Sequence, residues 1–222
     1  MPVLAITATD TGVGKTFVAC GIARAMRHRG IDVGVFKPFC TGDRSDVDQL
    51  TAASACGDRA EEVNPCFFTQ PLAPYRAAEL AGAPIAIDRC VAAFDVLRQR
   101  HDVLIVEGAG GVMVPLCADG DGMYSMRDFL ADIAAEAVVV ARRTLGTINH
   151  TWLTVDACRA RGIAVRGVVF NDAAPVSGDE PQASNPALAA RCASAPLLAH
   201  VPHNPPDAVW DSLADHLLGV AP

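Results

Sequence analysis

Short apolar runs alternate along the chain with longer segments in which apolar residues recur every three or four positions. The short runs have the length of strands and contain few polar residues, which is typical of strands buried on both faces of a parallel sheet. The longer segments have the spacing of amphipathic helices. The predicted strands are Val3–Thr7, Asp32–Lys37, Asp102–Glu107, Ala137–Ala141 and Val165–Asn171, and the predicted helices are Thr16–Arg29, Asp46–Cys56, Ile87–Arg100, Ser125–Ile133 and Thr147–Arg161.

Three segments between these elements show neither pattern and are predicted to be loops. Asn64–Pro74 and Ala173–Pro186 each contain three prolines, and Gly108–Gly122 is rich in glycine. The alternation of strands and helices predicts an α/β fold, a parallel sheet with helices on both faces, whose ligands bind at the carboxyl ends of the strands. Because 222 residues suit one large domain and no linker divides them, we expect a single domain over residues 1–222.

The turn between the first strand and the first helix has the sequence of a phosphate-binding loop. Thr9–Thr16 reads TDTGVGKT, and the backbone N–H groups of such a turn form an anion cradle with the helix N-terminus. We expect Lys15 to reach the β- and γ-phosphates of a nucleotide and the Thr16 hydroxyl to ligate Mg²⁺. The strict P-loop pattern has glycine at position 9, where this chain has threonine. The strand before the turn and the helix after it favour a P-loop over an ordinary glycine turn.

Two more strands end in charged residues at the same predicted edge. Glu107 follows a buried strand, where its carboxylate is placed to hold Mg²⁺ directly or through water. Lys37 ends the second strand and, with Lys15, is one of two lysines among 18 basic residues. Because an ammonium and a guanidinium are not interchangeable, we expect Lys37 to serve chemistry more than folding, with a solvated charge at the end of a strand as the alternative. Asp48 is expected to supply a further oxygen to the metal, with Asp46 as the competing choice.

Later strand ends carry polar groups whose patterns are less specific. Gly146 and Thr147 begin a predicted helix, whose first N–H groups would favour a carboxylate or phosphate, although a plain helix start has the same pattern. Asn171 ends a predicted strand, where its amide can form two hydrogen bonds with the N6 and N7 edge of adenine. Asparagine as a turn former is the alternative interpretation of this position.

Composition restricts the classes of ligand. A net charge of −7 and an aromatic content of 5% argue against a nucleic-acid partner, which needs clustered cations and stacking surfaces. The chain shows no secretory signal and no apolar run long enough to cross a bilayer, so we expect a cytoplasmic protein without a membrane partner. The eight cysteines are at least ten residues apart and lack zinc-ligand spacing, so we interpret them as reduced thiols that behave as small apolar residues.

Taken together, these segments resemble dethiobiotin synthetase. The hallmarks of that family are a TDTxVGKT loop, a KPxx(S/T)G segment, an EGAGG turn, an LGTINHT helix start and a late strand that ends in Asn. All five occur in this order between Thr9 and Asn171, so the resemblance covers nearly the whole chain. The chain departs from the family at Ala8, where glycine is usual, and at Ala199–Pro202, where the family usually reads glycine-x-Ile-Pro.

The resemblance implies an ATP-dependent cyclo-ligase that converts 7,8-diaminopelargonate, CO₂ and ATP into dethiobiotin, ADP and phosphate, with Mg²⁺ as cofactor. It also implies a homodimer in which Asn149 of one subunit completes the substrate site of the other. The implied site residues fall into four groups: catalytic Lys37, Lys15 and Thr11; nucleotide-binding Asp10, Thr11, Gly12, Val13, Gly14, Lys15, Thr16, Phe17, Asn171 and Pro202; substrate-binding Thr11, Lys37, Thr41, Gly110 and Asn149; and metal-binding Thr16, Asp48 and Glu107.

The main alternative is a P-loop switch ATPase of the partitioning type, which positions cargo as a nucleotide-gated dimer. Proteins of that type carry a second lysine before the loop and often a basic amphipathic tail. This chain has no lysine or arginine in residues 1–14 or 207–222. The sequence therefore favours the synthetase.

Overall fold

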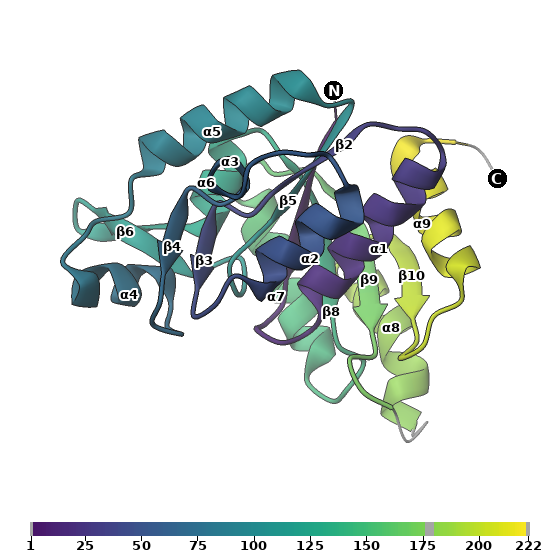
Figure 1. The fold of residues 1–222 in the computed structure, drawn as a ribbon. Coiled ribbons are helices and arrows are strands. Elements are labelled where there is room, and N and C mark those ends of the chain that lie inside the picture. Colours follow the sequence, from purple (N-terminus) through teal and green to yellow (C-terminus); the bar gives the residue numbers. More distant parts are fainter. Residues whose placement is uncertain (1, 176–179, 221–222) are drawn as a thin grey trace.

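The computed structural model describes residues 2–175 and 180–220 of the chain. Its centre is a parallel six-stranded sheet in the order β10-β9-β8-β1-β5-β2 (Figure 1). Three of these strands are buried along their whole length, which explains why their sequences contain almost no polar residue. The strands are β1 (Val3–Ala8), β2 (Val33–Phe36), β5 (Val103–Glu107), β8 (Glu136–Ala141), β9 (Val165–Asn171) and β10 (Leu197–Val201).

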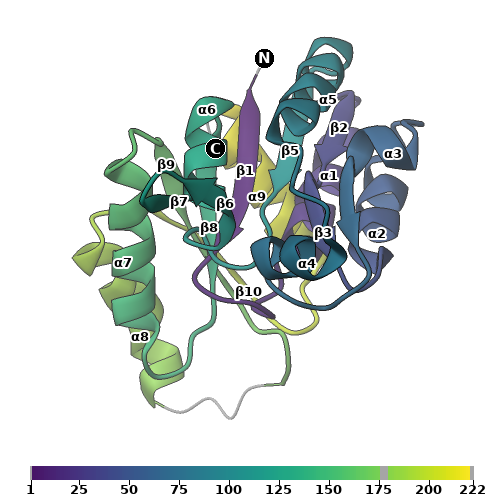
Figure 2. The same ribbon diagram turned by 90° about the vertical axis from the view of Figure 1, so that its left-hand side faces the viewer.

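Helices cover both faces of this sheet, which confirms the predicted fold class. One face packs against α1 (Lys15–His28), α2 (Ser45–Ser54) and α9 (Asp207–Leu218). The other face packs against α5 (Ile87–Arg100), α6 (Met126–Asp132), α7 (Thr147–Arg159) and α8 (Glu180–Cys192). Of these, α7 and α8 lie side by side at one flank (Figure 2). Within the described residues, no helix combines the length and apolarity that a bilayer-spanning segment requires.

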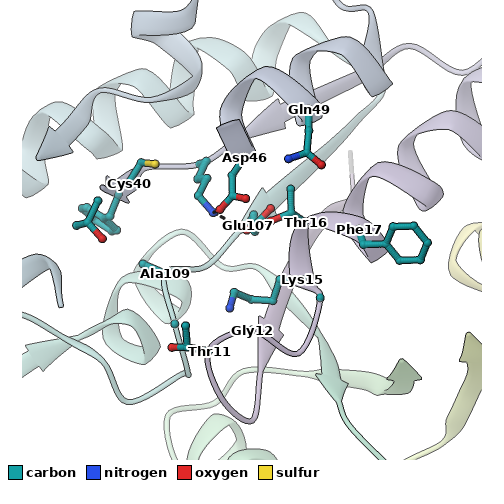
Figure 3. A pocket seen from close by; sticks show the side chains of 15 residues that line it. Thr11, Gly12, Lys15, Thr16, Phe17, Cys40, Asp46, Gln49, Glu107 and Ala109 are labelled. Atoms are coloured by element: carbon teal, nitrogen blue, oxygen red, sulfur yellow. Dashed lines mark hydrogen bonds and ion pairs between the residues drawn. The ribbon is translucent and has the colours of Figure 1, made fainter. Parts of the chain in front are cut away.

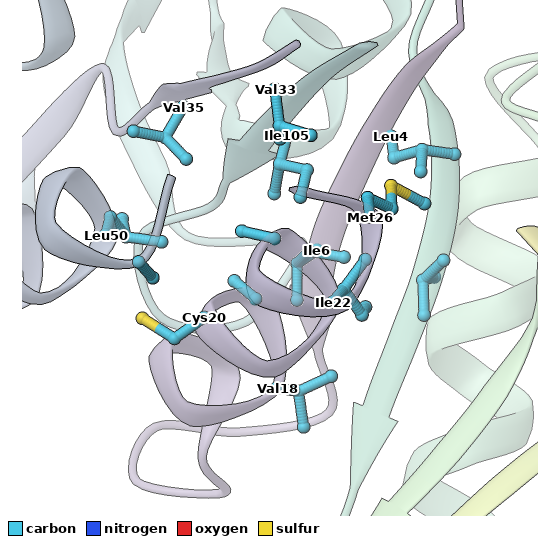
Figure 4. Packing of buried hydrophobic residues seen from close by; sticks show 14 of the residues in the cluster. Leu4, Ile6, Val18, Cys20, Ile22, Met26, Val33, Val35, Leu50 and Ile105 are labelled. Carbon is cyan, nitrogen blue, oxygen red and sulfur yellow. The ribbon is translucent and has the colours of Figure 1, made fainter. Parts of the chain in front are cut away.

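The packing of α1 fixes the position of the loop that precedes it. Ile22 and Met26 lie on the same stripe of α1 and are fully buried in one cluster with Ile6 of β1 (Figure 4). On another side, α9 approaches so closely that a Cβ atom at Gly21 would lie 2.5 Å from the ring of Trp210. Burying a side chain of the size of Ile22 or Met26 contributes about 1.5–3 kcal/mol to stability. α1 is therefore packed tightly against both β1 and α9, which holds the loop between β1 and α1 in place.

Short elements lie between the main ones. β3 (Phe39–Thr41) and β4 (Cys66–Phe68) pair in parallel, whereas β6 (Pro115–Asp119) and β7 (Gly122–Ser125) form an antiparallel hairpin. Two further helices, α3 (Ala60–Val63) and α4 (Pro74–Ala81), flank β4 in the sequence. Of these elements, β3 follows β2 directly and brings its side chains to the carboxyl edge of the sheet.

Every predicted strand and helix is present, with ends shifted by at most two residues, but the three predicted loops are partly wrong. The predicted loop Asn64–Pro74 contains β4, and Gly108–Gly122 contains β6 and the start of β7. In Ala173–Pro186, residues 176–179 lie outside the described residues, and α8 begins at Glu180 although two of the three prolines follow. Pro181 stands in the first turn, where a missing N–H costs no hydrogen bond. The prediction also omits β10, a partly exposed edge strand without an unbroken apolar run, and α9.

Candidate nucleotide and substrate site

The turn between β1 and α1 is a cradle of backbone groups. Gly12 and Gly14 have φ angles of 74° and 94°, in the left-handed region that favours glycine. Gly14 is the N-cap of α1 and provides no side-chain cap, so the first N–H groups of the helix remain available to an anion. The geometry is that of a phosphate-binding loop.

Asn171, at the end of β9, supports this loop from behind. Its Nδ2 donates a hydrogen bond to the carbonyl oxygen of Val13 at 2.9 Å, and a Cβ atom at Gly14 would collide with the same amide. Oδ1 of Asn171 has no hydrogen-bond partner among the described residues. The pairing with adenine uses one N–H and the oxygen of this amide. The bond to Val13 takes one of the two N–H groups, so the oxygen and the second N–H are left for a base.

A buried ion pair joins the ends of β2 and β5. Lys37 Nζ donates to Glu107 Oε1 at 2.5 Å and to Asp46 Oδ2 at 2.7 Å, and the Thr16 hydroxyl donates to the same Glu107 oxygen at 2.9 Å (Figure 3). Lys37 is 4% exposed and Glu107 is 1% exposed. Burial lowers the pKa of Lys37, but the two carboxylates more than offset this effect and raise it. The Lys37 side chain is therefore held as an ammonium.

Lys15 brings a second ammonium to the same place. It is buried, and its side chain extends across the cavity toward Thr11 (Figure 3). Burial lowers the pKa of Lys15, and the charge of Glu107 acts against this shift. An anion bound in the cradle would lie beside this cation.

These groups line a cavity of about 440 Å³ at the carboxyl edge of the sheet. A second cavity, of about 240 Å³, lies on the other side of the loop and includes Asn171. The first cavity brings together most of the residues expected from the sequence. Its lining consists of Thr11, Gly12, Gly14, Lys15, Thr16, Phe17, Lys37, Phe39, Cys40, Thr41, Asp46, Gln49, Glu107, Ala109 and Gly110.

The phase of α2 separates the two aspartates considered for the metal. Two positions along a helix correspond to a rotation of about 200°, so Asp46 and Asp48 point in different directions. Asp46 accepts the hydrogen bond from Lys37 and lines the cavity. Asp48 is exposed and does not line it. Asp46 therefore replaces Asp48 as the candidate metal ligand.

Four other expected residues lie away from the first cavity, and one of them, Val13, lines the second. Asp10 accepts a hydrogen bond from the N–H of Thr11 at 2.7 Å and forms an ion pair with Arg142. Pro202 directly follows β10 and is partly buried. Asn149 is exposed in the first turn of α7 and lines neither of the two cavities.

The oxygen atoms beside Lys37 fit a hard divalent cation. Glu107 Oε2 is buried and has no hydrogen-bond partner among the described residues, which is costly for a carboxylate unless a ligand binds it. The Thr16 hydroxyl bonds the other oxygen of this carboxylate, and Asp46 adds a second carboxylate at the same cavity. Oxygen donors of these kinds are the ligands that Mg²⁺ prefers.

Sequence reasoning missed a second charged group, beside the smaller cavity. Arg143 donates to both carboxylate oxygens of Asp172, at 2.8 and 2.6 Å, and His200 Nε2 lies 2.8 Å from Asp172 Oδ2. Arg143 and Asp172 each stand within two residues of the end of a predicted strand. Charged residues at that position are the signal that could have revealed this group, because strand ends converge on the ligand edge.

Comparison with known proteins defines the class. A family model described as an AAA domain matches residues 3–207. Among solved structures, a plasmid partition protein from Borrelia burgdorferi has a TM-score of 0.65 at 7% identity and covers 98% of each chain. The cell division protein MinD of Aquifex aeolicus has a TM-score of 0.61 at 12% identity, covering 99% of this chain and 98% of that one. At such identities the likeness shows the fold alone, and together with the cradle it defines a P-loop NTPase fold.

Similar curated sequences define the family within this class. The ATP-dependent dethiobiotin synthetase BioD of Bacillus licheniformis is 43% identical over 202 residues, which cover 89% of this chain and 84% of the relative. The protein of the same name from Anaeromyxobacter sp. (strain K) is 42% identical over 207 residues, 91% of this chain and 90% of the relative. The chain belongs to the ATP-dependent dethiobiotin synthetase family. This finding confirms the resemblance and the expected enzyme class, an ATP-dependent ligase of biotin biosynthesis.

Proposed function

We propose that the protein joins 7,8-diaminopelargonate and CO₂ and closes the ureido ring with the energy of ATP, giving dethiobiotin, ADP and phosphate. The proposal rests on one observation above all: two buried ammonium groups, Lys15 and Lys37, line one cavity beside a phosphate-binding loop. Family membership supports the same reaction.

The reaction passes through anions that suit this cavity. One substrate amine adds to CO₂ and gives a carbamate. A carbamate oxygen then attacks the γ-phosphorus of ATP, and ADP leaves. The second amine attacks the carbamate carbon, and phosphate leaves as the ring closes. Negative charge develops on the carbamate and on the transferring phosphoryl group, where fixed positive charge lowers the barrier.

Each lining group has a role in this proposal. Lys15 binds the β- and γ-phosphates. Lys37 binds the carbamate and the oxygens of the phosphoryl group that is transferred to it. The Thr11 and Thr41 hydroxyls orient the carbamate. At Gly110 a Cβ atom would lie 2.8 Å from Val114 and 3.5 Å from the Thr11 hydroxyl, so only glycine fits at this position, and its backbone would contact the substrate.

Mg²⁺ fits the oxygen atoms of Thr16, Glu107 and Asp46, and when bound it would neutralise charge on the phosphates. ATP would follow the loop formed by Asp10–Phe17, from the first cavity toward the second. Its base would lie near Asn171 and Pro202. The cytoplasmic location remains a prediction.

The proposal includes a homodimer whose substrate site is shared between subunits. Leu145, Trp152 and Leu153 are large apolar residues exposed on α7 or just before it, close in sequence to Asn149. Exposed apolar groups gathered on one element are typical of an interface. In a twofold dimer, Asn149 and the N-terminus of α7 would bind the tail carboxylate of a substrate in the partner's cavity.

The activity is tested by incubating the protein with MgATP, bicarbonate and 7,8-diaminopelargonate and detecting dethiobiotin by mass. Nucleotide hydrolysis stimulated by DNA or vesicles, without dethiobiotin, would instead support a partitioning ATPase. The shared site is tested by mixing Lys15→Ala and Asn149→Ala subunits. Random pairing makes half of the dimers mixed, and each mixed dimer has one intact site, so about a quarter of wild-type activity should return. No recovery after verified exchange would exclude the cross-subunit role of Asn149.

A further inference from the structure

Cys56, Asp58 and His101 meet at the amino-terminal edge of the sheet, away from the phosphate-binding loop. The Cys56 sulfur, a carboxylate oxygen of Asp58 and a ring nitrogen of His101 all lie within 4.8 Å of one another. The first two residues belong to the connection between α2 and α3, and His101 lies just before β5. All eight cysteines are free thiols, so Cys56 is available as a ligand.

The backbone around the cluster fixes these side chains in place. Gly57, between Cys56 and Asp58, has a φ angle of 76° and makes the tight turn that directs both side chains to one point. The imidazole of His101 packs directly over Gly34 of β2, where a Cβ atom would collide with the ring. The side chains of His101 and Asp58 are only 3% and 1% exposed.

The hydrogen bonds around His101 orient it as a metal ligand. Its Nδ1 lies 3.0 Å from Asp32 Oδ1, and its Nε2 lies 2.8 Å from Asp58 Oδ2. When Nδ1 donates to Asp32, the lone pair of Nε2 faces Asp58 and Cys56. Metal-bound histidines are oriented in this way, with the second ring nitrogen donating to a carboxylate outside the coordination shell. Arg100 pairs with the other oxygen of Asp58 and leaves Oδ2 for the cluster.

We propose that Cys56, Asp58 and His101 bind a Zn²⁺ ion that ties the α2–α3 connection to the edge of the sheet. Nitrogen, oxygen and sulfur are the donors of zinc sites, and in a tetrahedral site ligand atoms are about 3.5 Å apart, so small side-chain movements suffice here. One thiolate and one carboxylate balance the two charges of the ion. The Cys56 thiol and the imidazole–carboxylate pair each release a proton, and water completes the coordination. The competing arrangement is a metal-free network in which His101 is hydrogen-bonded between Asp32 and Asp58.

Cobalt binding to the full chain distinguishes the two arrangements. The protein is stripped with a chelator and titrated with Co²⁺, which takes tetrahedral zinc sites and gives a thiolate-to-cobalt charge-transfer band. We expect the band to saturate at one equivalent, to disappear on addition of Zn²⁺ and to be lost in Cys56→Ser and His101→Gln. The matched control is Cys192→Ser, which changes a partly buried cysteine on α8 and should keep the band. No band in the wild type, or a band that persists in Cys56→Ser, would overturn the proposal.

Two further measurements guard against loss of folding in the variants. In the wild-type protein, one equivalent of Zn²⁺ should protect Cys56 from alkylation while Cys192 still reacts, as read by peptide mass mapping, whereas Mg²⁺ should protect neither. Asp32→Asn keeps all three ligands and should weaken Co²⁺ binding by about 10- to 100-fold. Unprotected Cys56 would show that His101 serves only a metal-free polar network. Unchanged Co²⁺ affinity in Asp32→Asn would overturn the role of Asp32 in orienting His101 toward the metal.

Discussion

Lys37→Met should lower stability as well as activity, because it leaves Glu107 without its counter-charge. Glu107 is 1% exposed, and its Oε1 would keep only the Thr16 hydroxyl as a donor. Removing one partner of a buried ion pair costs about 3–5 kcal/mol. We expect the lower end, about 3 kcal/mol, because Asp46 is partly exposed and the carboxyl can take up a proton. For a chain of this size, that free energy corresponds to a fall in Tm of about 6–12 °C.

The assay is thermal unfolding followed by circular dichroism, without nucleotide or metal and at neutral pH. Burial raises the pKa of Glu107 and Lys37 opposes that shift, so the pKa rises further in the variant. A carboxyl group whose pKa is higher in the folded than in the unfolded state lowers the stability of the protein as the pH rises between those two values. The difference in Tm between the variant and the wild type should therefore grow from acidic to neutral pH. The double variant Lys37→Met/Glu107→Gln should recover most of the lost Tm but form no dethiobiotin. Equal melting of the single and double variants would refute the reasoning.

Three other predictions follow from single contacts. Gly21→Ala should cost about 1–3 kcal/mol in urea unfolding, because its Cβ would lie 2.5 Å from the ring of Trp210, and wild-type stability would contradict that packing. Asp46→Asn should raise the Mg²⁺ concentration needed for half-maximal rate and Asp48→Asn should not, whereas the opposite result would restore Asp48 as the ligand. Burial raises the pKa of Asp172, but bonds from a guanidinium and an imidazole lower it below 3.8 overall, so the stability that this group provides above that pH is lost on acidification. Asp172→Asn should therefore make the free energy of unfolding, measured with urea, fall less steeply at acidic pH than it does in the wild type. An unchanged pH dependence would show that the contact contributes little.

Five of the six strands of the central sheet could be predicted because each contains a mainly apolar run, whereas the partly exposed β10 does not. The edge that carries the site followed from the direction of those strands. What the sequence did not reveal depends on distances between elements. Lys37 and Glu107 are 70 residues apart, and only the pairing of β2 with β5 turns two separate charges into one buried ion pair. That pair gives Lys37 a role in folding beside the expected role in chemistry. The choice between Asp46 and Asp48 required the phase of a helix, which a pattern of residues does not fix to within one position.

The order of the strands also sets the spacing between the charged groups of the site. β5 lies between β1 and β2, so Glu107 starts from the strand that separates the two lysine-bearing segments. Neighbouring strands are about 4.8 Å apart, an interval that the backbone ladder keeps whatever the connecting loops contain. Substrate preference can therefore be re-engineered in those loops without altering where the charged side chains originate. A slip of β2 by one residue against β5, by contrast, would turn its side chains to the opposite face and dismantle the charge pattern at once.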